Sequence, residues 1–338
     1  MENQTTSAPL PDATPPRLLP AFVKGFNTVA GNIYLILLPV LVDLILWFGP
    51  HLRIKNIFLP LILEAIQTVR ETSTPQAREM LTGMEELWRL FLEHYNLLSN
   101  TSTFPLGVPS VMVGQSPLLT PLGQAAIIEV SAPLLVPAAW LFFSLVGFAL
   151  GSLYFASLAN SFQKAQAAPM RVALTPRVWL WQTMQMILLV VLLTILLVIV
   201  FIPTLLIASV LVLLSPALSW IVLLGVSFLA VWMLIPLMFT PHGIFALGQN
   251  VMNSALLSAR LVRQVLPGTG LFLLIAIVLY QGLGVLWRIP TETSWMALVG
   301  VLGHAFTGTG VVASSFAYYL SCLNWIQATA RRAAVPNA

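Results

Sequence analysis

Two ionisable residues, Asp43 and His304, fall inside long apolar stretches of the sequence and could do chemistry in a membrane. Asp43 lies in the apolar run 29–48, and His304 lies in the run 295–324. A charge at the bilayer centre costs at least about 2.5–3.5 kcal/mol, so such residues are functional candidates by default. Asp43 is close to the end of its run and could instead pair with a base at the interface. His304 could be a neutral histidine bonded between helices, a substrate contact or a proton relay.

Tyr280 and Gln281 are polar residues in the middle of the apolar run 270–287. With Asp43 and His304 they could line a cavity between the second, fifth and sixth apolar runs. A transporter or lipid-handling protein with such a cavity is therefore one hypothesis. Coupling to protons or sodium through paired carboxylates is disfavoured, because the apolar runs contain no pair of acidic residues.

A serine and a histidine also fall at similar depths in two apolar runs. Ser227 follows Gly225-Val226 in one run, and His304 lies in another. This arrangement, together with Trp88-Arg89 in a long preceding segment, resembles the rhomboid intramembrane serine proteases. Phe228 stands where those proteases have a glycine, and no histidine-rich helix follows Trp88-Arg89. A rhomboid-like protease is therefore only a distant alternative.

Motifs for soluble chemistry are missing from the sequence. It has no H-E-x-x-H, no Walker A loop and no glycine-rich nucleotide fingerprint. Its single cysteine, Cys322, excludes an internal disulfide and a metal site of several cysteines. We therefore expect no catalytic residue, metal or cofactor.

The composition places the chain in a membrane. Of its 338 residues, 58% are apolar and 8% are charged, and the mean hydropathy is +0.92. Soluble domains are about 25% charged. This excludes a soluble enzyme and a nucleic-acid-binding protein, and it indicates an integral membrane protein in contact with the lipid bilayer.

The apolar runs predict an all-α polytopic fold with six transmembrane helices. A span needs about 20 mainly apolar residues. The turn dipeptide Ser215-Pro216 divides a stretch of 82 uncharged residues into two of these helices. A disordered tail over 1–28 precedes the first helix, an interfacial helix is expected near 244–265, and the C-terminal tail is 326–338. The predicted spans are 29–50, 134–158, 179–207, 217–239, 270–287 and 295–324.

The segment 51–130 differs from the rest of the chain, because it holds 12 of the 26 charged residues. Its apolar residues recur at helical spacing, with Thr74 as a cap and Pro75 in the first turn of the second helix. We expect a helical hairpin outside the bilayer, followed by a proline-rich loop over 99–125 that lies on the membrane or on the hairpin. The apolar positions of the second helix are Leu81, Met84, Trp88, Phe91, Tyr95 and Leu98.

Lysine and arginine predict the orientation. Nine of the 15 basic residues fall in the two tails and in the loops 163–178 and 241–267. Short cytoplasmic loops are enriched in these residues. We therefore expect a protein of the bacterial cytoplasmic membrane with both termini in the cytoplasm and the hairpin outside it.

Small residues predict where helices approach closely. Gly303, Thr307, Gly310 and Ser314 recur every three or four residues, and Gly147 and Gly151 are four apart in the second span. Such positions let helix backbones come together in lipid. We expect the two sets to pack against each other.

One stretch resembles a known group of proteins. Ile235-Pro236-Leu237 is followed by Ser258-Ala259-Arg260-Leu261-Val262-Arg263 and then by a new span. This is similar to six-helix bacterial membrane proteins of unknown function, including the membrane domain joined to some glycerophosphodiester phosphodiesterases. The resemblance implies a membrane fold and no catalytic residues, since the phosphodiesterase chemistry lies in a separate soluble domain.

The main functional hypothesis is a non-enzymatic, membrane-embedded partner or permease-like component. The outer module 51–130, with Trp88 and Phe91 on its apolar face, would dock a protein partner or the bilayer surface.

Overall fold

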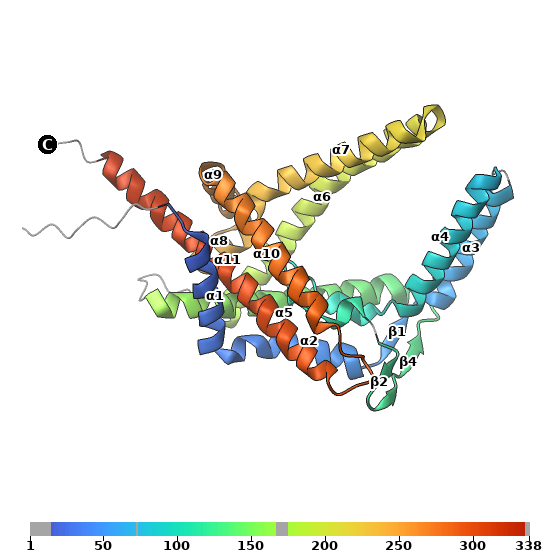
Figure 1. Ribbon diagram of the computed structural model, residues 1–338, viewed down its shortest axis with the longest axis horizontal. Coiled ribbons are helices and arrows are strands. Elements are labelled where there is room, and N and C mark those ends of the chain that lie inside the picture. The colour runs from blue at the N-terminus through green and yellow to red at the C-terminus, as the bar shows by residue number, and fades with distance from the viewer. Residues whose placement is uncertain (1–14, 72–73, 116, 167–174, 335–338) are drawn as a thin grey trace, which may run out of the picture.

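The computed structural model describes residues 15–71, 74–115, 117–166 and 175–334, and its architecture is almost entirely helical (Figure 1). Among these residues, five helices are long and apolar enough to cross a membrane. This confirms the predicted all-α polytopic class. The five are α5 (Leu135–Gln166), α6 (Pro176–Leu214), α7 (Pro216–Leu234), α10 (Leu266–Trp287) and α11 (Ala297–Ala334).

The first predicted span is not one straight helix. The chain forms α1 (Leu18–Gly31), the 3-10 turn η1 (Ile33–Ile36) and α2 (Leu37–Phe48), and the two halves are bent by 93°. The bend falls at Gly31-Asn32, where glycine is a poor helix former and the Asn32 amide donates to the Thr28 carbonyl at 2.9 Å.

The sequence predicted a disordered tail over residues 1–28, but α1 begins at Leu18 within that range. Residues 1–14 of the predicted tail lie outside the described residues. It is ordered because it packs along α11. The Phe22 ring stacks on Phe272 of α10, with centroids 4.9 Å apart, and Phe26 packs against Phe306 of α11. Because Phe22 lies near Ser314 and Phe26 near Phe306, α1 runs antiparallel to α11.

Helices α6 and α7 form the long apolar hairpin expected from Ser215-Pro216. Thr175 caps α6, its hydroxyl accepting from the Val178 amide at 3.3 Å. The predicted interfacial helix near 244–265 is instead two helices, α8 (Thr240–Leu247) and α9 (Val251–Gln264), which follow the 3-10 turn η4 (Ile235–Leu237). Gly248 separates them at a φ of 64°, and α8 is buried from Thr240 to Ala246. Only α9 has exposed apolar residues suited to an interface.

The predicted hairpin in 51–130 is confirmed. It consists of α3 (Lys55–Glu71) and α4 (Pro75–His94), which extend side by side away from the bundle (Figure 1). Arg70 of α3 lies 3.2 Å from Glu85 of α4, and Lys55 lies 3.6 Å from Glu93.

Short strands join this hairpin to the bundle. Strand β1 (His51–Arg53) pairs in parallel with β4 (Ile127–Glu129), and β2 (Leu119–Thr120) pairs antiparallel with β3 (Gly123–Gln124).

The 97–115 segment, which contains the 3-10 turns η2 (Leu97–Thr101) and η3 (Met112–Gly114), enters the helix bundle. We expected this proline-rich stretch on the membrane or on the hairpin. However, Val108, Val111 and Met112 are buried in the same core as α2, α5 and α11. Irregular backbone is tolerated among membrane helices where protein buries it and satisfies its hydrogen bonds.

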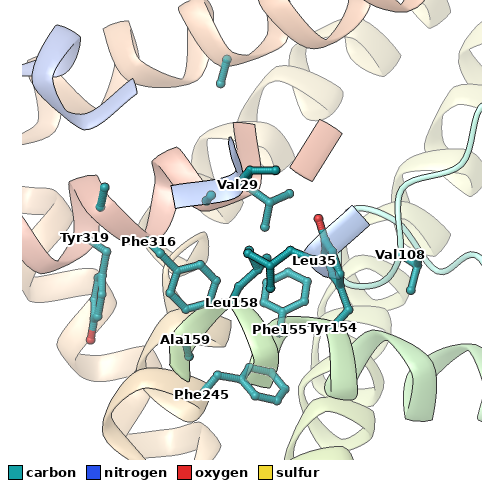
Figure 2. Close-up of a cluster of buried hydrophobic side chains, with 14 of the residues drawn as sticks. Val29, Leu35, Val108, Tyr154, Phe155, Leu158, Ala159, Phe245, Phe316 and Tyr319 are labelled. Carbon is teal, nitrogen blue, oxygen red and sulfur yellow. The ribbon is translucent and has the colours of Figure 1, made fainter. Parts of the chain in front are cut away.

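The main core lies where α1, α5, α8 and α11 meet. In Figure 2, Phe155 and Leu158 extend from α5 toward Phe316 of α11, and Phe245 of α8 lies next to Ala159. The Phe155 and Phe316 ring centroids are 5.9 Å apart. This packing joins α5, α8 and α11, which all contribute residues to the site described below.

Candidate functional site

A cavity of about 500 Å³ lies between the membrane helices. The 97–115 segment, the turn η4 and the helices α5, α6, α7, α8, α10 and α11 all contribute lining residues. Its lining is almost wholly apolar. The lining residues are Phe104, Pro105, Leu106, Phe155, Leu189, Leu193, Leu234, Leu237, Met238, Pro241, His242, Phe272, Leu273, Ala276, Ile277, Tyr280, Gln281, Val311, Val312 and Ser315.

Two of the four predicted cavity residues, Tyr280 and Gln281, line this cavity. Tyr280 is held between two rings. Phe104 of the 97–115 segment stacks on it with centroids 4.8 Å apart, and His304 of α11 meets it edge-on at 5.3 Å.

His304 itself is buried behind Tyr280 and is not among the lining residues. Neither of its ring nitrogens has a hydrogen-bond partner among the described residues. The bond between helices that we considered for His304 is therefore not seen there.

Asp43 is buried and also lies outside the cavity lining. Its carboxylate accepts hydrogen bonds from the Ser110 hydroxyl, from the Val111 amide at 3.2 Å and from the Met112 amide at 3.1 Å. The predicted interfacial pairing of Asp43 with a base is wrong. The carboxylate instead binds the turn of the 97–115 segment that enters the bundle, and so it anchors the segment whose Phe104 covers Tyr280.

His242 and Ser315 are the other polar residues of the lining, and the sequence analysis did not select them. His242 Nε2 lies 2.7 Å from Ser315 Oγ, and Ser315 Oγ lies 2.7 Å from the Val312 carbonyl. The signal that could have found His242 was its position as the sole titratable residue in a stretch of 82 uncharged residues.

The small-residue positions pack differently from the prediction. A Cβ on Gly147 would meet the Asn100 carbonyl at 2.6 Å, and a Cβ on Gly151 would meet Gly107 at 2.8 Å. These glycines therefore face the 97–115 segment and not α11.

The small residues of α11 face other partners. Gly303 packs on the Trp287 ring and Gly310 on the Phe26 ring. The Ser314 hydroxyl lies close to Gly25 and bonds the Gly310 carbonyl at 2.7 Å, and the Thr307 hydroxyl bonds the Gly303 carbonyl at 3.0 Å.

The structure does not form the serine–histidine pair of an intramembrane protease. Ser227 is exposed on α7, whereas His304 is buried on α11 without a hydrogen-bond partner among the described residues. Trp88 packs on Phe91, and Arg89 bonds Glu85 at 2.8 Å within α4. This arrangement gives the rhomboid-like alternative no support.

No group of three or more potential metal ligands occurs among the described residues.

Comparisons with protein-family models, curated proteins and solved structures found no match. The resemblance to the phosphodiesterase membrane domain therefore stays a prediction. In the stretch that carries it, the Ser258 hydroxyl donates to the Pro236 carbonyl at 2.7 Å and accepts from the Phe239 amide at 3.1 Å, which fastens α9 to η4.

Proposed function

We propose that this protein binds the hydrocarbon chain of a membrane lipid in the cavity, as a lipid-handling component that carries out no catalysis. The observation that carries the proposal is an apolar cavity of about 500 Å³ between membrane helices. Ligand sites typically measure about 300–1,000 Å³ and combine an apolar wall with a few polar groups. Tyr280, Gln281, His242 and Ser315 are those groups here.

A cavity-lining residue that is also exposed supports access from the bilayer. Ile277 of α10 lines the cavity and is also 56% exposed. Leu189 and Leu193 of α6 also line the cavity. A lipid chain in the surrounding bilayer would pass between these helices without crossing a polar layer.

The proposed setting is the bacterial cytoplasmic membrane, with both termini in the cytoplasm and the α3–α4 hairpin outside. The antiparallel packing of α1 on α11 supports the placement of both termini on one side of the membrane, because it brings the start of α1 beside the C-terminal half of α11. In this orientation the 97–115 segment would enter the bundle from the outer face.

A second candidate function, docking of a protein partner by the α3–α4 hairpin, is favoured by an apolar stripe on α4. Met80, Met84, Leu87 and Phe91 follow one another at helical spacing and are all exposed. If a partner binds there, the double variant Leu87→Glu with Phe91→Glu will lose a protein that copurifies with the native chain. The control double variant Glu79→Gln with Glu86→Gln, which changes residues outside the stripe, will retain that protein. Equal recovery with both pairs would remove this role.

Native mass spectrometry of the protein from detergent tests the lipid-binding proposal. Ala276→Phe and Val312→Phe place a ring in the cavity from two different helices, and we expect each to abolish bound-lipid adducts. Leu274→Phe is the matched control, because Leu274 is exposed on α10 and is not a lining residue. Adducts of equal intensity in all three folded variants would refute lipid binding in the cavity.

A further inference from the structure

We propose that the lipid in the cavity carries a phosphate group, which binds Arg288 at the end of α10 while the hydrocarbon chain occupies the cavity. This inference rests on the proposed lipid-binding function and specifies the head group of the lipid. It starts from a face of α10 that continues beyond the cavity lining and ends in an arginine.

One face of α10 leads from the cavity to Arg288, the residue that caps the C-terminal end of this helix. At about 100° per residue, Gly284 and Arg288 fall on the same face as the lining residues, one and two turns beyond Tyr280. A Cβ added to Gly284 would meet nothing within 4 Å, so this face is open between the cavity and Arg288. The lining residues of α10 are Phe272, Leu273, Ala276, Ile277, Tyr280 and Gln281.

Arg288 is exposed, and its positive charge reaches the cavity. The guanidinium interacts electrostatically with Tyr280, which lines the cavity, and with His304, which lies behind Tyr280. Long side chains on a helix lean toward its N-terminus, and for Arg288 this direction is toward the cavity. The salt bridges within the described residues do not include Arg288. Its charge is therefore available to an anionic ligand.

Tyr280 and Gln281 place two neutral donors between Arg288 and the apolar part of the cavity. Gln281 lines the cavity and is also exposed, so it lies at an open edge. Within the described part of the chain, neither the Tyr280 hydroxyl nor the Gln281 amide makes a hydrogen bond. Both groups can donate to phosphate oxygens. The negative charge of Asp43 also acts on Tyr280, but that carboxylate is buried and accepts three hydrogen bonds from the 97–115 segment.

Two tryptophans place Arg288 at the level of lipid head groups. Trp287 ends α10, and Trp295, which is 58% exposed, precedes α11. Tryptophan is enriched where a membrane helix meets the head groups. Gln281 lies seven residues, or about 10 Å, deeper along α10 than Arg288. A lipid with its chain in the cavity would thus bring its phosphate to Arg288, which can bind it by charge-assisted hydrogen bonds.

Equilibrium binding of tritiated hexadecyl phosphate to the full chain in a neutral detergent tests the inference. Unlabelled hexadecyl phosphate and 1-hexadecanol are the competitors, because they share one chain and differ in the phosphate. We expect hexadecyl phosphate to compete at least about fivefold better than the alcohol, the upper value for one exposed ion pair. Equal competition, or tighter competition by the alcohol, would overturn the inference while leaving lipid binding intact.

Inorganic phosphate distinguishes a lipid head group from a free anion. At the concentration at which hexadecyl phosphate displaces half of the label, inorganic phosphate should displace none, because it lacks the chain that fills the apolar cavity. Equal displacement by inorganic phosphate would indicate a site for the free anion and would overturn the inference.

Variants at exposed residues separate recognition of the phosphate from binding of the chain. Arg288→Gln removes the charge, so the preference for the phosphate should fall below about twofold while the affinity for 1-hexadecanol stays unchanged. Arg288→Lys keeps a positive charge and should retain part of the preference. Arg263→Gln is the matched control, because Arg263 is exposed on α9 and is not a lining residue.

Two results would contradict the role of Arg288. They are a full preference for the phosphate in Arg288→Gln, and an equal loss of preference in Arg263→Gln. If the native chain binds neither hexadecyl phosphate nor 1-hexadecanol, the proposed function fails together with the inference.

Discussion

The ring of Phe104 lies stacked on the ring of Tyr280, with centroids 4.8 Å apart and planes inclined by 15°. The two residues are 176 positions apart in the chain, and the contact joins the 97–115 segment to the middle of α10. Both rings line the cavity. The segment that follows the charged hairpin therefore supplies one wall of a site between the membrane helices.

Removal of this wall should weaken lipid retention. Phe104→Ala loses an aromatic pair worth about 0.5–1.5 kcal/mol, so bound lipid should dissociate about 2- to 12-fold faster. Phe142→Ala is the control, because Phe142 is exposed on α5 and does not line the cavity. Dissociation of a tritiated lipid from both variants measures the difference, and identical rates would contradict a role for the stack.

Asp43 should control the position of the 97–115 segment. In Asp43→Asn one carboxylate oxygen becomes an amide nitrogen, which donates and does not accept. Either the Val111 or the Met112 amide then loses its acceptor, so the variant should lose about 1–3 kcal/mol of stability. A cysteine at Val113 should then react faster with a water-soluble maleimide. Unchanged thermal stability and cysteine reactivity would show that the carboxylate does not hold this segment.

The contact of α1 with α11 should be sensitive to a single methyl group. A Cβ on Gly25 would lie 2.4 Å from the Ser314 backbone nitrogen, which cannot move aside, so Gly25→Ala should cost about 1–3 kcal/mol of stability. Gly282→Ala on α10 is the matched control, because nothing lies within 4 Å of its added Cβ. Thermal unfolding in detergent compares the two, and similar midpoints would contradict close packing at Gly25.

The hairpin should loosen in acid. The Arg89 guanidinium, which bonds Glu85, holds the pKa of that carboxyl below its ordinary value of 4.5, and Arg70 of α3 contributes to the shift. When folding lowers the pKa of a carboxyl, the ionised carboxyl stabilises the fold at every pH above its unfolded-state pKa. This stabilisation is lost as the pH falls through the folded-state pKa. Protection factors for amide hydrogen exchange in α3 and α4, which correct for the intrinsic slowing of exchange in acid, should therefore fall below about pH 4.5 in the native chain. Glu85→Gln should show lower protection at neutral pH as well and a weaker response to acid.

The sequence predicted most of the helices because apolar length decides them. Ser215-Pro216 correctly divided α6 from α7, and Thr74-Pro75 marked the start of α4. The bend at Asn32 was missed, although Gly31-Asn32 is a helix-ending pair, because the apolar residues continue across it.

The site could be predicted only in part, because it depends on contacts between distant segments. Tyr280 and Gln281 were found as polar residues in an apolar helix, and they do line the cavity. Asp43 was recognised as unusual, but its partners are the Ser110 hydroxyl and the backbone amides of Val111 and Met112, about 70 residues away, and no sequence spacing links them to Asp43. His242 lies on the short buried helix α8, whereas the sequence placed it between the predicted span 217–239 and the predicted interfacial helix near 244–265.

Site-specific photolabelling tests the central claim most directly. A hexadecanol carrying a diazirine on its chain, incubated with the full protein in nanodiscs, should label the cavity residues Leu193, Leu273 and Val312, and an excess of unlabelled hexadecanol should abolish this labelling. Val278 and Leu224 are exposed outside the cavity lining, so their labelling should not saturate. Labelling confined to such exposed residues, or cavity labelling that persists unchanged in Ala276→Phe, would contradict a lipid site between these helices.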